Sequence, residues 1–279
     1  MRFPEGKLKA LTLSYDDGVK ADLRLAEILN KYGIKCTFNL NSGFMWEAGK
    51  ATPDEFKEHI LPHGHEIAVH GARHIAPGIG GPCATIDDVL TCRRELERTF
   101  DTIIRGLAYP DTGITKMHNG NTYEEVRAYL KALGIVYARS LRGDNDEFML
   151  PTDFYAWIPT AHHQNPELMT YAEKFLSIKD EELRWSGRFP RLFYLWGHSY
   201  EFDNNQNWDR IEAFCQLLSG KEDIWYATNI EICEYCLAFR SLIMNVDRTK
   251  VYNPTLVKLW MDVDGKTYAI APGETLMIP

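Results

Sequence analysis

Two separated segments of the chain carry carboxylates and imidazoles, the side chains that proteins use to bind metals and to move protons. Residues 14–18 read Ser-Tyr-Asp-Asp-Gly and follow an apolar run, and residues 70–74 read His-Gly-Ala-Arg-His and follow another. If both runs are parallel strands, these segments lie at their carboxyl ends, which is where an α/β fold collects its ligands. The pattern therefore indicates a metal-assisted hydrolase.

His70 and His74 stand four residues apart, so both rings project from one face if the chain turns helical after the strand. One of Asp16 and Asp17 completes a set of three metal ligands. The other stays free as a base for a water molecule that a divalent ion acidifies to a pKa of about 7. Each segment also has a purely structural interpretation, because Asp-Asp-Gly is a common turn and a spaced His pair is often a coincidence of a helix surface.

Further matches make the chain similar to a known family, the polysaccharide deacetylases of the NodB-homology group, also called carbohydrate esterase family 4. The family's first motif, a hydroxyl residue followed by Phe-Asp-Asp-Gly, resembles residues 14–18. Its second motif resembles Gly-His-Glu-Ile at residues 64–67 together with residues 70–74. Its third motif and its late Leu-x-His motif resemble residues 107–113 and 195–198. The motifs fall in the family's order over roughly residues 8–200, most of the chain.

The resemblance implies a role for each of these polar residues. Asp17, His70 and His74 bind a divalent metal. Two imidazoles and a carboxylate favour zinc, and cobalt, nickel or manganese suit a similar site. Asp16 takes the proton of the attacking water, and His198 protonates the leaving group.

Four further residues are predicted to contact the substrate or the transition state. Tyr109 and Trp196 would form an apolar wall around an acetyl methyl or a sugar face, although both also suit a core. A backbone N–H near Asp111 would stabilise the oxyanion. Arg139, at the end of an apolar run, would point into the same mouth, and it reads equally well as a surface cation.

The sequence departs from the family pattern at three places. Gly71 replaces the usual hydroxyl residue of the second motif. Ala108 stands where the family often carries an Arg that orients the catalytic Asp, and Arg139 is a candidate to substitute for it. The family's Asp-Trp motif, whose Asp tunes the acid His, has no clear match. The candidates for that Asp are Asp144, Asp146 and Asp153.

Strand-like and helix-like runs alternate along the chain, which predicts an α/β fold. The strands are expected near residues 8–15, 35–41, 66–70, 106–109, 135–140, 192–196 and 224–228. The helices are expected near residues 21–32, 85–104, 122–133, 166–178 and 206–219, with a last helix that ends near 243. About seven βα units imply a distorted or incomplete (β/α) barrel, and the family resemblance implies the same fold.

The last part of the chain has a different pattern. From residue 250 onward β-forming residues alternate with turns, and Asp264-Gly265 lies between two β-prone runs, as in a hairpin. We therefore expect a deacetylase-like barrel domain over residues 1–245 and a short C-terminal β-hairpin extension over residues 246–279.

The composition limits the partners and the compartment. A chain of 279 residues that is 45% hydrophobic can bury one large core, and a net charge of −8 argues against nucleic-acid and anionic-membrane partners. The chain has no apolar stretch long enough for a membrane helix and no signal-peptide core at its start, so a cytoplasmic location is expected. The six cysteines, including Cys233 and Cys236 in a helical pattern, are expected to be thiols.

Three functions stay open on the sequence. The first is removal of acetyl groups from N- or O-acetylated sugars, with a short oligosaccharide or a small acetylated metabolite as the expected substrate. The second is hydrolysis of another C–N bond on the same scaffold. The third is a non-catalytic carbohydrate-binding or metal-holding relative. The presence of Asp16 and His198 argues against the third, because binding alone needs neither a base nor an acid. The oligomeric state is open.

Overall fold

The computed structural model describes residues 1–118, 120–141, 143–183 and 187–278 and is built around a parallel sheet. Seven strands follow the order β5-β4-β3-β2-β1-β7-β6, and an eighth, β8, pairs with β1. The strands are β1 (Lys9–Asp16), β2 (Cys36–Leu40), β3 (Glu66–Val69), β4 (Gly106–Ala108), β5 (Tyr137–Arg139), β6 (Ala161–His162), β7 (Arg191–Gly197) and β8 (Ile224–Tyr226). Within the described ranges β5 and β6, the two ends of this order, do not pair with each other. The predicted incomplete (β/α) barrel is confirmed.

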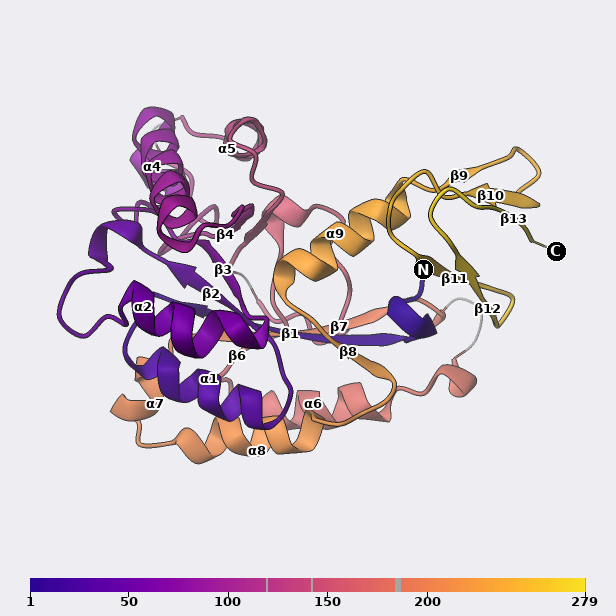
Figure 1. Ribbon diagram of the computed structural model, residues 1–279, viewed down its shortest axis with the longest axis horizontal. Coiled ribbons are helices and arrows are strands. Elements are labelled where there is room, and N and C mark those ends of the chain that lie inside the picture. Colours follow the sequence, from indigo (N-terminus) through magenta and orange to yellow (C-terminus); the bar gives the residue numbers. More distant parts are fainter. Residues whose placement is uncertain (119, 142, 184–186, 279) are drawn as a thin grey trace.

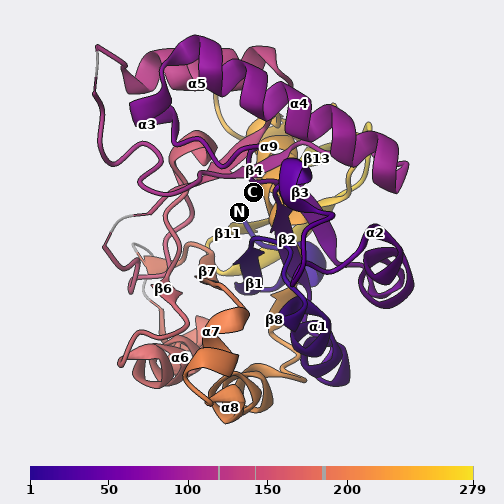
Figure 2. The ribbon, with the colours of Figure 1, turned by 90° about the vertical axis from the view of Figure 1, so that its left-hand side faces the viewer.

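Helices cover the sheet on two sides. Figures 1 and 2 show α4 and α5 on one side of the strands and α1, α6 and α8 on the other. The longer helices are α1 (Ala21–Lys31), α4 (Pro82–Phe100), α5 (Tyr123–Ala132), α6 (Leu168–Ser177), α8 (Trp208–Leu218) and α9 (Asn229–Arg240). The short ones are α2 (Pro53–Glu55), α3 (Pro77–Gly80) and α7 (Tyr200–Asn204). The helix expected near residues 206–219 is thus α8, and α7 precedes it.

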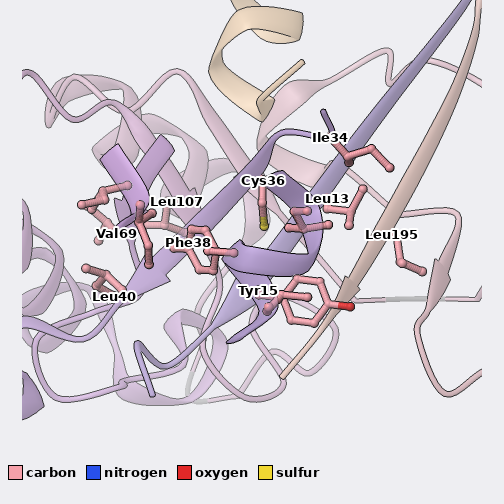
Figure 3. Packing of buried hydrophobic residues seen from close by; sticks show 14 of the residues in the cluster. Leu13, Tyr15, Ile34, Cys36, Phe38, Leu40, Val69, Leu107 and Leu195 are labelled. Carbon is pink, nitrogen blue, oxygen red and sulfur yellow. The ribbon is translucent and has the colours of Figure 1, made fainter. Parts of the chain in front are cut away.

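β1 is the central strand and is buried along its whole length. Leu13 and Tyr15 pack into the main hydrophobic core together with residues of the neighbouring strands, such as Phe38 (Figure 3). Because side chains alternate along a strand, Thr12 and Asp16 belong to the opposite face. The period that buries Leu13 and Tyr15 therefore directs Asp16 away from that core, at the carboxyl end of the strand.

Antiparallel strands at the C-terminus add to the barrel, as the sequence predicted (Figure 1). β9 (Ile243–Met244), β10 (Lys250–Tyr252) and β13 (Thr275–Met277) form one sheet, and β11 (Leu259–Val263) and β12 (Lys266–Ile270) form a hairpin. Asp264 and Gly265, both with positive φ, make the turn of this hairpin. Arg2, which is fully buried, contacts Asp262 at 2.9 Å and so ties the hairpin to the start of the chain. The division at residues 245 and 246 stays a prediction.

Two further expectations concern cysteines and membranes. All six cysteines are free, and Cys233 and Cys236 are buried on α9. In the part of the chain that the structure describes, no helix is both long and apolar enough to cross a membrane.

Acidification is expected to destabilise the fold through His65, which precedes β3 and is 5% exposed. Its Nδ1 accepts a hydrogen bond from the backbone N–H of Cys36, and its Nε2 lies 2.9 Å from Oδ1 of Asn30. Burial lowers the pKa of His65 from 6.5 to about 4. Its contribution to stability is therefore complete above pH 6.5 and is lost as the pH falls toward about 4. The whole effect corresponds to about 3 kcal/mol of unfolding free energy.

Urea unfolding of the wild type and of His65→Gln at neutral pH and at about pH 4.5 measures this contribution. We expect the variant to be less stable at neutral pH and to lose less free energy on acidification. An equal loss in both proteins would show that His65 does not titrate as its burial implies.

Candidate metal and catalytic site

The predicted site residues lie at the carboxyl ends of three strands. Asp16 ends β1 and Asp17 follows it, His70 follows β3, and His198 follows β7. β7 pairs directly with β1, and β2 lies between β1 and β3. Because all these strands are parallel, their carboxyl ends open on the same side, and the parallel register brings residues far apart in sequence to one mouth.

Asp17, His70 and His74 form a compact group. One potential ligand atom from each lies within 4.8 Å of those of the other two. Nε2 of His70 lies 3.8 Å from Oδ1 of Asp17 and 3.9 Å from Oδ2 of Asp16. Asp17 has φ of 80°, a conformation that L residues rarely adopt and that is common at functional sites.

The two histidines reach this group from a loop and not from a helix. The segment after β3 is irregular, and His74 has φ of 58°. The helical turn that was expected to bring His70 and His74 to one face is therefore not formed. The buried carboxylate of Asp88 holds the loop, since it accepts hydrogen bonds from the backbone N–H groups of Arg73 and Ile75. A Cβ at Gly71 would approach Asp88 to 2.3 Å, which explains why a glycine replaces the family's hydroxyl residue.

The tautomer of His70 indicates that this group suits a cation. Nδ1 of His70 lies 2.9 Å from the carbonyl oxygen of Ala108 and, since a carbonyl can only accept, must carry the proton. In the neutral ring Nε2 is then a bare lone pair facing Asp16 and Asp17. Burial lowers the pKa of His70, although the charge of Asp16 opposes this effect. A lone pair directed at two carboxylates is electrostatically unfavourable unless a positive charge lies between them, and His and Asp are ligands of transition metals.

Asp16 is 2% exposed and is held by two donors. Nδ2 of Asn39 donates to its Oδ1 at 2.8 Å, and Nη2 of Arg139 donates to its Oδ2. Burial by itself would raise the pKa of Asp16, but the charge of Arg139 and the hydrogen bond that it donates oppose burial, and the net effect lowers the pKa. Asp16 therefore stays ionised at neutral pH.

Arg139 contacts Asp16 and is 1% exposed, so it is not a surface cation. Its guanidinium also lies 4.5 Å from the ring centre of Trp196, and the two stack. Arg139 is therefore in contact with the carboxylate that the family's Arg is expected to orient, whereas Ala108 has no group that could do so. Direct contact of Arg139 with the substrate stays a prediction.

The other residues predicted to contact the substrate differ in how exposed they are. Trp196 is partly exposed and lies beside His198, with ring centres 5.8 Å apart. Tyr109, expected to line the substrate site, is instead 1% exposed in the main core, and its hydroxyl donates to the carbonyl of Tyr155. Asp111 is exposed in the turn after β4. The oxyanion role of the Asp111 backbone stays a prediction.

His198 also lies close to both carboxylates. Its Nε2 lies 3.9 Å from Oδ2 of Asp16 and 4.0 Å from Oδ2 of Asp17, and its Nδ1 lies 3.1 Å from Oε1 of Glu201. Burial would lower the pKa of His198, but the hydrogen bond with Glu201 and the charges of Asp16 and Asp17 outweigh it and raise the pKa. His198 is thereby kept in a form that can donate a proton.

The carboxylate at Nδ1 of His198 belongs to Glu201 and to none of the three predicted aspartates. Asp144 accepts from Asn165 and Tyr171, Asp146 pairs with Lys174, and Asp153 pairs with Arg127. The signal for Glu201 was its position three residues after His198, in the first turn of α7. A second missed group is His162 and His163, which lie on the other side of Glu201.

Comparison with known proteins relates part of this site to a family model. The model of the family described as polysaccharide deacetylase matches residues 4–138. That range contains Asp16, Asp17, His70 and His74, whereas His198 lies beyond it. None of the curated proteins compared is significantly similar to the chain.

Several solved structures share the fold. A putative polysaccharide deacetylase from Mycobacterium smegmatis aligns with a TM-score of 0.58 at 17% identity, over 86% of this chain and 94% of that chain. Puue allantoinase aligns with a TM-score of 0.59 at 14% identity, over 83% and 91%. A family 4 acetyl xylan esterase from Clostridium thermocellum, in complex with a cobalt ion, aligns with a TM-score of 0.51 at 14% identity, over 82% and 92%. Residues 4–138, slightly less than half of the chain, therefore resemble the polysaccharide deacetylase family, and the solved structures show that the chain shares their fold.

Proposed function

We propose that the protein is a metal-dependent hydrolase that removes acetyl groups from N- or O-acetylated sugars. The observation that carries the proposal is the position of His198 Nε2, 3.9 Å from Oδ2 of Asp16 and next to the Asp17, His70 and His74 group. A candidate base and a candidate acid thus lie beside each other and next to a candidate metal group. That arrangement suits hydrolysis of an acyl bond, in which one group takes a proton from water and another gives one to the leaving group.

Asp17, His70 and His74 would hold the metal, and the bare Nε2 of His70 fits that role. A divalent cation bound there supplies Lewis acidity, which lowers the pKa of water and polarises a carbonyl. Two imidazoles and a carboxylate favour zinc, while cobalt, nickel and manganese also accept such ligands. The acetyl xylan esterase that shares the fold is in complex with a cobalt ion.

The chain's own residues supply the proton transfers and the orientation. Asp16, kept ionised by Arg139, takes the proton of the attacking water. His198, with its Nδ1 toward Glu201, gives a proton from Nε2 to the departing nitrogen or oxygen. Trp196 would lie against the acetyl methyl or a sugar face, and a backbone N–H at Asp111 would stabilise the oxyanion.

The substrate we favour is a short acetylated oligosaccharide or a small acetylated metabolite. A second candidate is hydrolysis of another C–N bond, since an allantoinase shares the fold. A non-catalytic role is disfavoured, because Arg139 orients Asp16 and Glu201 orients His198, an arrangement that carbohydrate binding does not require.

Acetate release from a panel of N- and O-acetylated sugars tests the proposal. We expect the zinc-loaded protein to release acetate, the chelated protein to release none, and re-addition of zinc, cobalt, nickel or manganese to restore the activity, because the Lewis acid contributes several kcal/mol to such reactions. Cyclic and linear amides without an acetyl group serve as the comparison set. Turnover confined to those amides would favour the second candidate, and no turnover on any compound by metal-loaded protein would contradict the proposal.

A further inference from the structure

A second cluster of imidazoles surrounds Glu201, beyond the residues already assigned. Nε2 of His163 lies 2.9 Å from Oε2 of Glu201, and Nε2 of His162 lies 3.3 Å from the same oxygen. The other oxygen, Oε1, lies 3.1 Å from Nδ1 of His198. One carboxylate is therefore in contact with three imidazoles, and only His198 faces Asp16 and Asp17.

This cluster has the composition of a metal site, but its protonation favours hydrogen bonds. Nδ1 of His162 accepts the backbone N–H of Gln164 at 3.2 Å, so neutral His162 carries its proton on Nε2, which faces Glu201. Burial lowers the pKa of His162 to about 4, which keeps the ring neutral. The proton on Nε2 of His162 therefore lies near Oε2 of Glu201, 3.3 Å from the nitrogen, and His162 lacks the free lone pair that His70 presents at its own site.

His163 is held in place by aromatic rings on both faces. It is fully buried and stacks between the rings of Tyr15, at 5.5 Å, and Phe202, at 4.1 Å. A Cβ at residue 197 would approach Nδ1 of His163 to 1.9 Å, so Gly197 is required for this packing. His163 cannot reach a substrate, and its polar contact within the site is with Glu201.

We propose that His162 and His163 are positioning residues that hold Glu201, and through it His198, for proton donation to the leaving group. Glu201 is about one-fifth exposed, with a side-chain exposure of 23%, and a glutamate side chain that is held only at one oxygen can rotate toward solvent. The two imidazole nitrogens within 3.3 Å of Oε2 restrain that rotation by their close contact and leave Oε1 directed at Nδ1 of His198. The free Nε2 of His198 then points toward Asp16 and the reacting bond. The inference rests on the proposed function, in which His198 is the acid.

The leaving group provides a readout that distinguishes positioning from general stability. An acetamide or an alkyl acetate needs a proton on its leaving atom, whereas the nitrophenolate of para-nitrophenyl acetate leaves without one. If His198 is no longer held in position, the hydrolysis of acetylated sugars should therefore become slower, and the hydrolysis of para-nitrophenyl acetate should keep its rate. A variant that only destabilises the fold or weakens metal binding slows both substrates by the same factor.

His163→Phe is the main variant, because phenylalanine can keep the stack between Tyr15 and Phe202 and has no N–H for Glu201. We expect kcat on the acetylated sugar to fall about 10- to 100-fold, part of the roughly 10²- to 10⁴-fold that acid catalysis contributes, with KM, metal content and para-nitrophenyl acetate turnover little changed. His163→Gln, which retains an N–H donor, should restore part of the loss. His65→Gln, at a buried histidine remote from Glu201, is the matched control and should leave the ratio of the two activities unchanged.

The ring N–H of His198 gives a second readout that does not depend on turnover. In NMR spectra of the zinc-loaded protein we expect a slowly exchanging Nδ1–H signal from His198. Glu201→Gln and His163→Phe should each weaken this signal. His65→Gln should leave it unchanged. An unchanged signal and an unchanged ratio of activities in His163→Phe would overturn the proposal. If the wild type hydrolyses none of the substrates, the proposed function fails and the NMR comparison alone decides whether His163 positions His198.

Discussion

Replacement of Asp16 by asparagine is expected to reduce acetate release by about 10³-fold while the metal content stays unchanged. Asp16 faces Nε2 of His198 and is kept ionised by Arg139, but it is not part of the Asp17, His70 and His74 group. Asparagine has nearly the same shape and cannot take a proton, so the variant separates proton transfer from metal binding. Acetate release and elemental analysis on the same sample provide the measurement.

Asp22→Asn is a matched control for this experiment. Asp22 is also fully buried, and burial raises its pKa to about 8, so it is mostly protonated at neutral pH. Its Oδ1 accepts a hydrogen bond from Oγ of Ser199, which the amide oxygen of asparagine can also accept. We expect Asp22→Asn to retain its activity. Comparable activity of Asp16→Asn and Asp22→Asn would exclude Asp16 as the base.

Loss of the Asp16 charge also leaves Arg139 buried without its partner. Removal of one member of a buried ion pair typically costs about 3 to 5 kcal/mol, so Asp16→Asn is expected to unfold at lower denaturant concentration. Activity is therefore compared at a temperature where circular dichroism shows both variants to be folded. A loss of activity that merely follows unfolding would not identify a base.

The elements that carry the site could be predicted because hydrophobic periodicity and strand ends are local properties. The alternation that buries Leu13 and Tyr15 in β1 also fixes the face of Asp16, and it can be read without tertiary information. The family order of the motifs added His198, which lies far from Asp16 in sequence. The structure brings these residues together as expected.

Residues whose role depends on a contact across the fold were harder to predict. Tyr109 directly follows a strand, the position expected of a residue at the mouth of the barrel, but its side chain packs into the core. Hydrophobic periodicity does not determine which way a side chain points at the end of a strand. Arg139 was noted as a substitute for the missing orienting Arg, and only the structure shows its contact with Asp16. Glu201 lies within a helical turn of His198, but the family pattern predicts an aspartate in this role.

His162 and His163 were missed for a related reason. They lie at the end of a strand of two residues, β6, inside a loop-rich stretch without clear periodicity. An adjacent pair of histidines on a strand normally points to opposite faces, so the sequence does not suggest that both contact one carboxylate. That contact arises because α7 carries Glu201 over the end of β6.

Replacement of His70 by alanine is expected to abolish both metal binding and acetate release. Its Nδ1 donates to the carbonyl of Ala108, which fixes the ring and leaves Nε2 toward Asp17 at 3.8 Å. Loss of a direct ligand should weaken metal binding by more than the roughly 10- to 100-fold that loss of an outer-shell partner costs. Elemental analysis after dialysis, and zinc titration of the chelated protein, measure the effect.

His162→Gln is the control for His70→Ala, because His162 belongs to the second group of two histidines and a carboxylate. His162 carries its proton on Nε2 and His70 carries its proton on Nδ1, so the two groups differ in protonation although their composition is alike. We therefore expect His162→Gln to retain the metal of the wild type, whereas His70→Ala loses it. The reverse result, metal retained in His70→Ala and lost in His162→Gln, would move the metal to Glu201 and would contradict both the proposed catalytic centre and the positioning role of His163.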